Sequence, residues 1–323
     1  MPSLYRQVVW YMRGRSQYTK SGFLNAAKHF QPGDLDVDAS NTHFMITGAN
    51  SGLGKECALE FAKRGATVHM VCRNEERAHQ AKQEIEQEAS SSSLHVHIVD
   101  MANTRAVSEF AHNFVASGHK LDVLINNAGC MIHKRIQTAD GFETNFAVNT
   151  LAPYLLTTLL LPLLKQSSDP RVINVSSGGM LLHKLNARDP QLEDAAFDGV
   201  DAYSQQKRQQ VVLSHVWAEQ NPWLRSYSMH PGWADTPAVR DALPDFYQRM
   251  KDNLRDVHEG ADTIIWLALA PNIPDQHNGK FFQDRKPVSE HLPLAFTSSS
   301  TADVEAFVDG LGKMAEPYLA PPQ

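Results

Sequence analysis

Two side chains suited to proton transfer, Tyr203 and Lys207, stand four residues apart in a segment that we predict to be helical. Side chains at this spacing project from one face of a helix, so the phenol and the ammonium are expected to meet. A free tyrosine has a pKa of about 10 and exchanges protons poorly at neutral pH. A neighbouring ammonium favours the phenolate, and the spacing therefore predicts a lowered pKa for Tyr203.

A glycine-rich stretch lies far upstream of this pair, between an apolar run, His43–Ile46, and an apolar helical stripe in Lys55–Lys63. Gly48 permits a sharp turn, Gly52 permits close approach of an anion, and Gly54 permits close helix–strand packing. The helix N-terminus would then face a pyrophosphate, which predicts dinucleotide binding. The alternative is an ordinary glycine-rich turn. The stretch reads Thr47, Gly48, Ala49, Asn50, Ser51, Gly52, Leu53, Gly54.

The end of the second predicted strand, Thr67–Val71, indicates which dinucleotide is bound. An acidic residue there would hold the ribose 2′-hydroxyl of NAD, whereas this chain carries Arg73, which suits a 2′-phosphate. The sequence therefore favours NADP(H), with NAD(H) as the alternative. Arg73 could equally be a surface residue paired with Glu75 or Glu76.

Strand and helix patterns alternate from Thr42 onward, which predicts an α/β fold: a doubly wound, Rossmann-like parallel sheet with helices on both faces. We expect one domain, 42–323, after an N-terminal extension, 1–41. Residues 184–201 are expected to form a loop beside the active site. The predicted strands are 43–47, 67–71, 94–99, 123–126, 171–175, 224–228 and 280–282; the predicted helices include 55–63, 75–88, 104–116, 141–165, 202–219 and 259–270.

Composition excludes several classes of protein. The chain has 323 residues, of which 42% are hydrophobic, and a net charge of −6, so no nucleic-acid partner is expected. Its three cysteines, Cys57, Cys72 and Cys130, lack metal-ligand spacing and suggest a reducing, intracellular compartment. The fifteen histidines show no zinc-binding pattern, so we expect scattered histidines and no metal site.

The first 33 residues contain no acidic side chain but carry five basic ones around an apolar, aromatic patch in 4–12. Three interpretations compete: a helix packed on the main domain, a basic segment in peripheral contact with a membrane, and a transit peptide. Cytoplasmic or membrane-surface localisation is therefore favoured over a mitochondrial one. No run of 18 apolar residues predicts a membrane span, and Leu151–Leu164 is expected to be a core helix.

Taken together, the motifs resemble those of the short-chain dehydrogenase/reductase family over nearly all of residues 42–283. The resemblance implies the predicted fold and an oxidoreductase that interconverts an alcohol and a carbonyl. The motifs are Thr47–Gly54, Asp100, Asn126–Gly129, Asn149, Asn174–Ser177, Tyr203 to Lys207, and Pro231-Gly232.

The resemblance implies a catalytic set of Asn149, Ser177, Tyr203 and Lys207. Tyr203 would exchange the proton, Ser177 would hold the substrate oxygen in preference to Ser176, and Lys207 would also bind the nicotinamide ribose. Asn149 would hold a water against the lysine. Two positions depart from the family pattern: Ala152 replaces a glycine and Gln206 replaces a serine.

The resemblance also implies further cofactor contacts beyond the glycine turn. A turn-capping aspartate and plain turns remain the alternatives at these places. The implied contacts are Asp100, Asn127, Ala128, Gly129, Pro231, Gly232 and Thr236, together with Tyr203 and Lys207.

Three functional hypotheses follow: an NADP(H)-dependent oxidoreductase, a non-catalytic dinucleotide-binding scaffold, and a membrane-associated structural protein. A complete catalytic set favours the enzyme. The substrate is a small alcohol or carbonyl compound, and family members commonly form dimers by helix pairing, so a homodimer is an expected partner state. The sequence does not specify the identity of the substrate or the direction of the reaction. An apolar, lipid-like substrate would suit a pocket lined by Leu181, Leu182, Ala195, Phe197, Trp233 and Phe246, which could equally be packing residues.

Overall fold

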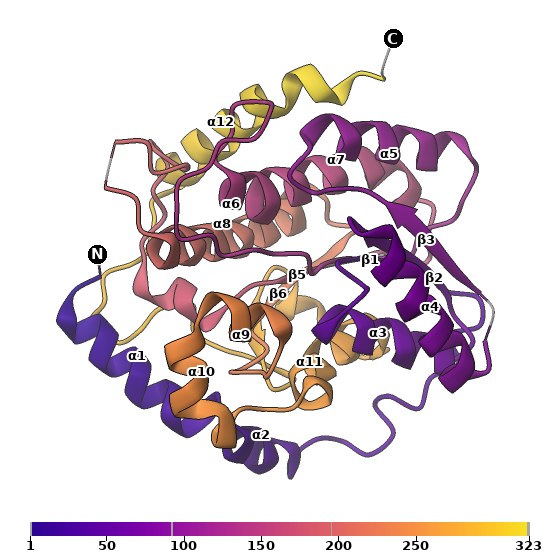
Figure 1. Cartoon of the computed structure of the whole chain (residues 1–323), viewed down its shortest axis with the longest axis horizontal. Helices are drawn as coiled ribbons and strands as arrows, with labels where there is room; N and C mark the ends of the chain where they lie inside the picture. Colours follow the sequence, from indigo (N-terminus) through magenta and orange to yellow (C-terminus); the bar gives the residue numbers. More distant parts are fainter. Residues whose placement is uncertain (1, 92, 195, 322–323) are drawn as a thin grey trace.

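A single eight-stranded sheet forms the centre of the molecule (Figure 1). The structure is a computed structural model that describes residues 2–91, 93–194 and 196–321. The strand order is β3-β2-β1-β4-β5-β6-β7-β8; the first seven strands run parallel, and β8 pairs antiparallel with β7. The strands are β1 (His43–Thr47), β2 (Thr67–Cys72), β3 (Leu94–Ile98), β4 (Val123–Asn126), β5 (Arg171–Val175), β6 (Arg225–Met229), β7 (Phe281–Gln283) and β8 (Lys286–Pro287).

Helices cover both faces of the sheet, which confirms the predicted doubly wound fold. One face packs on α3 (Gly52–Lys63), α4 (Glu75–Ala89) and α11 (Val257–Leu269). The other packs on α5 (Thr104–Ala116), α7 (Ala152–Leu164) and α8 (Gly199–Gln220). Central strands such as β5 are buried along their whole length, because a parallel sheet lies between two helical layers.

The C-terminal helix α12 (Thr301–Leu319), which the sequence patterns did not predict, packs on α5 and α7. Phe307 and Leu311 of α12 are buried in the core on that side of the sheet. Pairing of two copies through the outer faces of α5 and α7 would therefore require α12 to move.

The predicted helix 141–165 is one continuous helical run, Thr144–Leu164, made of α6 (Thr144–Phe146), a π-helical turn η1 (Ala147–Leu151) and α7. Its mean hydropathy of 1.6 and its length would suit a membrane span, but 67% of the apolar window is buried inside the fold. It packs between α5 and α8, where a core helix was expected.

The N-terminal segment folds into α1 (Leu4–Gln17) and α2 (Lys20–Ala27), which pack on the main domain. Arg255, whose exposed fraction is 1%, donates to the backbone oxygens of Gln17 and Thr19 and forms a two-bonded ion pair with Asp284. A helix packed on the domain was one of the three interpretations of this segment. The remaining helices are η2 (Gly178–Leu182), α9 (Pro237–Ala242), α10 (Pro244–Met250), η3 (Lys251–Asn253) and η4 (Asp275–His277).

Candidate active site

The predicted site residues gather at the carboxyl edge of the parallel sheet. The turn after β1 carries the glycines, the turn after β4 carries Asn127–Gly129, and the turn after β5 carries Ser177. The strand order reverses between β1 and β4, where open α/β sheets form a binding crevice. The fold therefore brings the two halves of the predicted site to one crevice.

The glycine turn has the geometry of an anion cradle. Gly48 and Gly52 both have positive φ, at 69° and 53°, which favours glycine at these positions. A Cβ on Gly54 would lie 2.5 Å from the Gly48 carbonyl oxygen, so α3 can approach β1 only without a side chain there. The backbone of this turn fits a dinucleotide pyrophosphate, whereas the Leu53 side chain points into the core.

Two further predicted contacts lie at the outer end of the crevice. Arg73 is exposed after β2, and within the described residues it forms no ion pair with Glu75 or Glu76. Its guanidinium is therefore available to a 2′-phosphate. One carboxylate oxygen of Asp100 accepts the Ala102 backbone N–H at 2.9 Å, which is the turn-capping role that the sequence left open.

The turns on either side of the glycines are braced against them. Asn127 Nδ2 donates to the backbone oxygens of Thr47 and Gly48, and the Thr47 hydroxyl accepts the backbone N–H of Ala128. Thr236 caps the N-terminus of α9, and a Cβ on Gly52 would lie 3.5 Å from the Thr236 methyl group. Thr236 therefore lies over the predicted pyrophosphate turn.

Ser177 and Tyr203 lie at the centre of the predicted catalytic set. The Ser177 hydroxyl is near enough to the Tyr203 phenol to lower its pKa, so both groups can reach one substrate oxygen. The rival, Ser176, is buried and donates its hydroxyl proton to the Lys207 backbone oxygen at 2.7 Å. The fold thus uses Ser176 to hold α8 and leaves Ser177 at the crevice.

Lys207 lies beside Tyr203, as the four-residue spacing predicted, with its Nζ 5.3 Å from the centre of the phenol ring. The expected lowering of the tyrosine pKa is wrong for this geometry: burial raises the pKa of Tyr203 to about 12, opposed by its hydrogen bond with Ser177. Burial also lowers the pKa of Lys207 to about 7. The lysine Nζ donates to the Val175 backbone oxygen and to Gln210.

Asn149 lies in the π-helical turn η1, a type of irregularity that is frequent at functional sites. Its side chain accepts the Cys130 backbone N–H at 2.9 Å and lies 2.9 Å from the amide of Gln206. The departure at Gln206 therefore contacts the asparagine that the resemblance assigns to the catalytic set.

Gln210, which no sequence pattern singled out, contacts two residues of the predicted site. Its Oε1 accepts from Lys207 Nζ at 3.2 Å, and its Nε2 donates to the Asn149 backbone oxygen at 2.7 Å. Gln210 thus joins the two groups directly across the place where the resemblance implied a water. The signal was present in the helical spacing, because residues 203, 207 and 210 share one face of α8.

Comparison with known proteins identifies the family. A family model described as short chain dehydrogenase matches residues 42–185. Dehydrogenase/reductase SDR family member 12 from Homo sapiens is 53% identical over 316 residues, covering 98% of this chain and 99% of that protein. The chain belongs to the short-chain dehydrogenase/reductase family.

Other matches agree with this assignment. Retinol dehydrogenase 12 from Bos taurus is 37% identical over 255 residues, covering 78% of this chain and 80% of that protein. A solved structure from Mycobacterium paratuberculosis matches with a TM-score of 0.67 and 27% identity, covering 88% of this chain and 97% of that one. The predictions of an oxidoreductase family and a Rossmann-like fold are confirmed.

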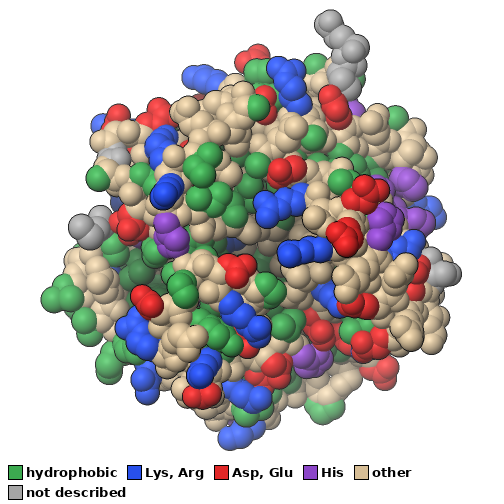
Figure 2. Space-filling view, in the orientation of Figure 1, with side chains coloured by type: hydrophobic (Ala, Val, Ile, Leu, Met, Phe, Trp, Pro, Cys, Tyr) green, Lys and Arg blue, Asp and Glu red, His purple; other side chains and the backbone are tan. Residues whose placement is uncertain are grey.

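Five histidines of this short-chain dehydrogenase/reductase gather at the β3 edge of the sheet, so the expectation of scattered histidines is wrong (Figure 2, right side). His69 and His95 are register partners on β2 and β3, with stacked rings 5.1 Å apart. His69 Nδ1 lies 3.0 Å from His97 Nε2. Residues 95 and 97 are two apart on a strand, so their side chains lie on the same face of the sheet. The zinc-binding patterns considered in the sequence have helical spacing and do not include this arrangement. The five are His43, His69, His95, His97 and His119.

This histidine cluster predicts loss of stability in acid. Burial, with the neighbouring histidines, lowers the pKa of His69 to about 3 and that of His97 to about 4. Because the unfolded chain then binds more protons than the folded one, stability is full above pH ~6.5 and falls as the pH decreases towards these values. Each group contributes a slope of roughly 1.4 kcal/mol per pH unit. Urea unfolding at pH 7 and at pH 5 measures this change in the free energy of unfolding.

His69→Gln should lower the slope of unfolding free energy against pH by the contribution of about one proton. His29→Gln, at an exposed position on the same chain, should leave this slope unchanged. Equal stability of the unsubstituted protein at the two pH values would contradict the prediction. The other ionisable groups facing the cluster are Lys82, Lys120 and Asp122.

Proposed function

We propose that the protein is an NADP(H)-dependent oxidoreductase that reduces the carbonyl group of an apolar small molecule to an alcohol, or runs the reverse reaction. The observation that carries the proposal is the contact between Ser177 and Tyr203 at the crevice edge, beside the glycine turn after β1. A screen of aldehydes and ketones for NADPH consumption tests it. Absence of turnover across aliphatic, aromatic and isoprenoid carbonyl compounds would count against it.

In the proposed mechanism, the nicotinamide supplies the hydride when the cofactor is bound. Ser177 Oγ and the Tyr203 hydroxyl hold the carbonyl oxygen, on which negative charge develops. A phenol with a pKa of about 12 is fully protonated at neutral pH, so Tyr203 is in the form that gives its proton to that oxygen. Burial therefore keeps the Tyr203 hydroxyl in its protonated form.

Lys207 and Asn149 hold in place the face of α8 that carries Tyr203. Lys207 is held by the Val175 oxygen and by Gln210, and Asn149 is held by Cys130 and Gln210. A Cβ on Gly129 would lie 3.1 Å from Asn149 Oδ1 and 3.4 Å from Lys207 Nζ, so the turn after β4 closes tightly over both. These contacts place the Lys207 amino group beside the turn after β4, where it can bind the cofactor ribose.

The cofactor preference depends on Arg73 in this proposal. NADPH should bind at least several-fold more tightly than NADH, because the free guanidinium can pair with the 2′-phosphate. Arg73→Ala should remove the preference and leave NADH affinity unchanged. Titration of each cofactor, followed by protein fluorescence, gives both dissociation constants. Arg77→Ala, one turn into α4, is the matched control, and equal affinities in the unsubstituted protein would refute the assignment.

We also propose that the exposed part of α1 around Met12 and Arg15 contacts anionic membranes. Met12 has an exposed fraction of 68%, the neighbouring Arg15 is exposed, and α1 contains no acidic residue in its first turn. Met12→Asp with Arg15→Glu should reduce sedimentation with anionic vesicles and leave cofactor affinity unchanged. Ile136→Asp with Lys134→Glu alters a comparable exposed apolar and basic pair elsewhere and should have no effect. Equal sedimentation of all three proteins would reject membrane contact.

A further inference from the structure

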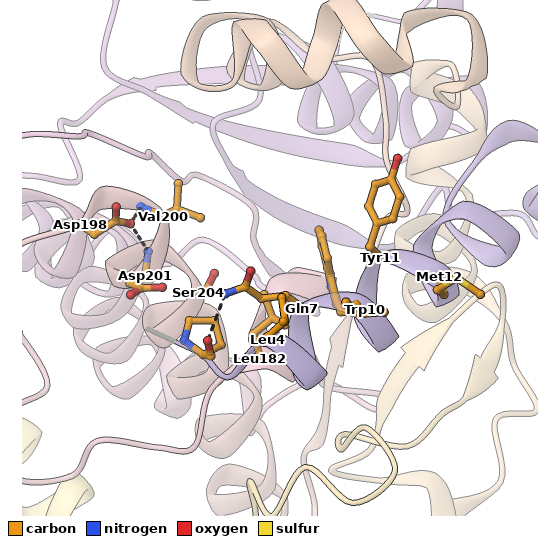
Figure 3. A pocket seen from close by; sticks show the side chains of 12 residues that line it. Leu4, Gln7, Trp10, Tyr11, Met12, Leu182, Asp198, Val200, Asp201 and Ser204 are labelled. Atoms are coloured by element: carbon orange, nitrogen blue, oxygen red, sulfur yellow. Dashed lines mark hydrogen bonds between the residues drawn. The ribbon is translucent and has the colours of Figure 1, made fainter.

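A cavity of about 610 Å³ lies between α1, the turn η2 and the first turns of α8. This volume is within the range of small-molecule sites, about 300–1,000 Å³. Figure 3 shows that α1 contributes one wall and α8, with Asp198, Val200, Asp201 and Ser204, contributes the other. Of the apolar residues predicted for a pocket, Leu182 lines it. Leu181, Trp233 and Phe246 pack in the adjoining core, and Ala195 lies outside the described residues.

Gly179 lies between Ser204, which lines the cavity, and Ser177. A Cβ on Gly179 would lie 2.9 Å from Ser204 Oγ, at the cavity wall, and 3.6 Å from Ser177 Oγ. Because glycine has no side chain, nothing on this residue separates the two hydroxyls. A substrate oxygen at Ser177 and a substrate chain in the cavity can therefore belong to one molecule.

The helix that forms the outer wall is attached to the loop that carries Ser177. Trp10 Nε1 donates to the Gly178 backbone oxygen at 2.7 Å, and Arg6 donates to the Leu182 backbone oxygen at 3.1 Å. These bonds fix α1 relative to the catalytic serine. The wall is thus a fixed part of the site.

The lining is apolar and unusually exposed. Exposed fractions are 76% for Leu4, 52% for Val8 and 45% for Tyr11, all on α1, and 39% for Val200 on α8. Contiguous exposed apolar side chains mark binding surfaces. The carboxylates of Asp198 and Asp201 at the α8 side would repel an anionic group, which favours a neutral ligand.

We propose that this cavity binds the neutral, apolar chain of the substrate whose carbonyl group lies at Ser177 and Tyr203, and that α1 determines the accepted chain length. The inference rests on the oxidoreductase function proposed above. It assigns substrate selection to an N-terminal helix that lies outside the matched family model, residues 42–185.

A series of straight-chain aldehydes from butanal to dodecanal, with NADPH, tests the inference. In the unsubstituted protein, kcat/KM should rise with chain length, by up to about fourfold for each buried methylene group. Val8→Trp fills the cavity and should lower kcat/KM for decanal by at least about tenfold through KM, while butanal changes less than about twofold. Leu24→Trp, at an exposed site on α2 outside the cavity, is the control and should change neither substrate.

Calorimetric titration with 1-decanol separates this inference from the proposed function. The unsubstituted protein and Leu24→Trp should bind decanol, and Val8→Trp should bind it at least about tenfold more weakly. Decanol binding that Val8→Trp abolishes, without turnover of any aldehyde, would support the cavity and overturn the oxidoreductase proposal. Turnover that is independent of chain length, or decanol binding that Val8→Trp leaves intact, would overturn the cavity assignment.

Discussion

Tyr203→Phe should lower turnover by about 10²–10⁴-fold while NADPH affinity stays within about twofold, because general acid catalysis is typically worth that much. The substitution removes one hydroxyl and keeps the ring, which packs beside Lys207. The glycine turn and Arg73 do not depend on the phenol oxygen. Steady-state rates on any aldehyde found in the screen, with a cofactor titration, measure both quantities.

Two companion variants sharpen this test. Tyr154→Phe, on α7 and away from the crevice, removes an equivalent hydroxyl and should leave turnover unchanged. Lys207→Ala should damage both turnover and cofactor binding, since the ammonium is assigned to the ribose and orients the tyrosine face of α8. Near-normal turnover of Tyr203→Phe would refute the mechanism, and tight cofactor binding without any turnover in the unsubstituted protein would favour the scaffold hypothesis.

Arg255→Met should lower the free energy of unfolding by roughly 3–5 kcal/mol, the usual cost of leaving one partner of a buried ion pair alone. The exposed fractions of the paired side chains are 1% for Arg255 and 8% for Asp284. The same guanidinium donates to the backbone oxygens of Gln17, Thr19 and Pro231, so its loss also releases the N-terminal segment from the turn after β6. Urea unfolding gives the stability, and limited trypsin digestion reports release of α1.

The matched control is Arg240→Met, which breaks an ion pair with Asp235 on the surface of α9, where the arginine side chain is 52% exposed. Exposed pairs contribute about 0–1 kcal/mol, so this variant should unfold nearly like the unsubstituted protein. Similar losses in the two variants, or an unchanged rate of digestion near α1 in Arg255→Met, would show that Arg255 does not anchor the segment.

Local sequence patterns predicted much of the fold. Strands β1, β4 and β5 and helix α5 begin and end at the predicted residues, because apolar periodicity and turn residues determine short regular elements. Strand β8 was missed because two residues carry no periodicity, and α12 was missed although Ser300 and Asp303 form a capping box. The buried residues of α12, Phe307, Leu311, Ala315 and Tyr318, recur at helical spacing, so the signal for α12 was present in the sequence.

Some properties of the candidate site could likewise be predicted from the sequence, and others could not. The spacing of Tyr203 and Lys207 and the glycine positions are local properties, and both could be read from the chain. The pKa of Tyr203 could not, because burial raises it and the direction of the Lys207 ammonium depends on Val175 and Gln210. Desolvation is a property of the packed molecule, and spacing alone gives no measure of it.

The sequence by itself determined the family, the strand-to-helix turn that can hold a dinucleotide, and the residue types available for proton transfer. Only the tertiary structure decided that Ser176 is tied to α8 and that α1 forms a wall beside Ser177. It alone also decided that five histidines meet at the β3 edge. The physical reason is that these contacts join residues from separate elements, whose meeting depends on how the sheet and its two helical layers pack rather than on any local pattern.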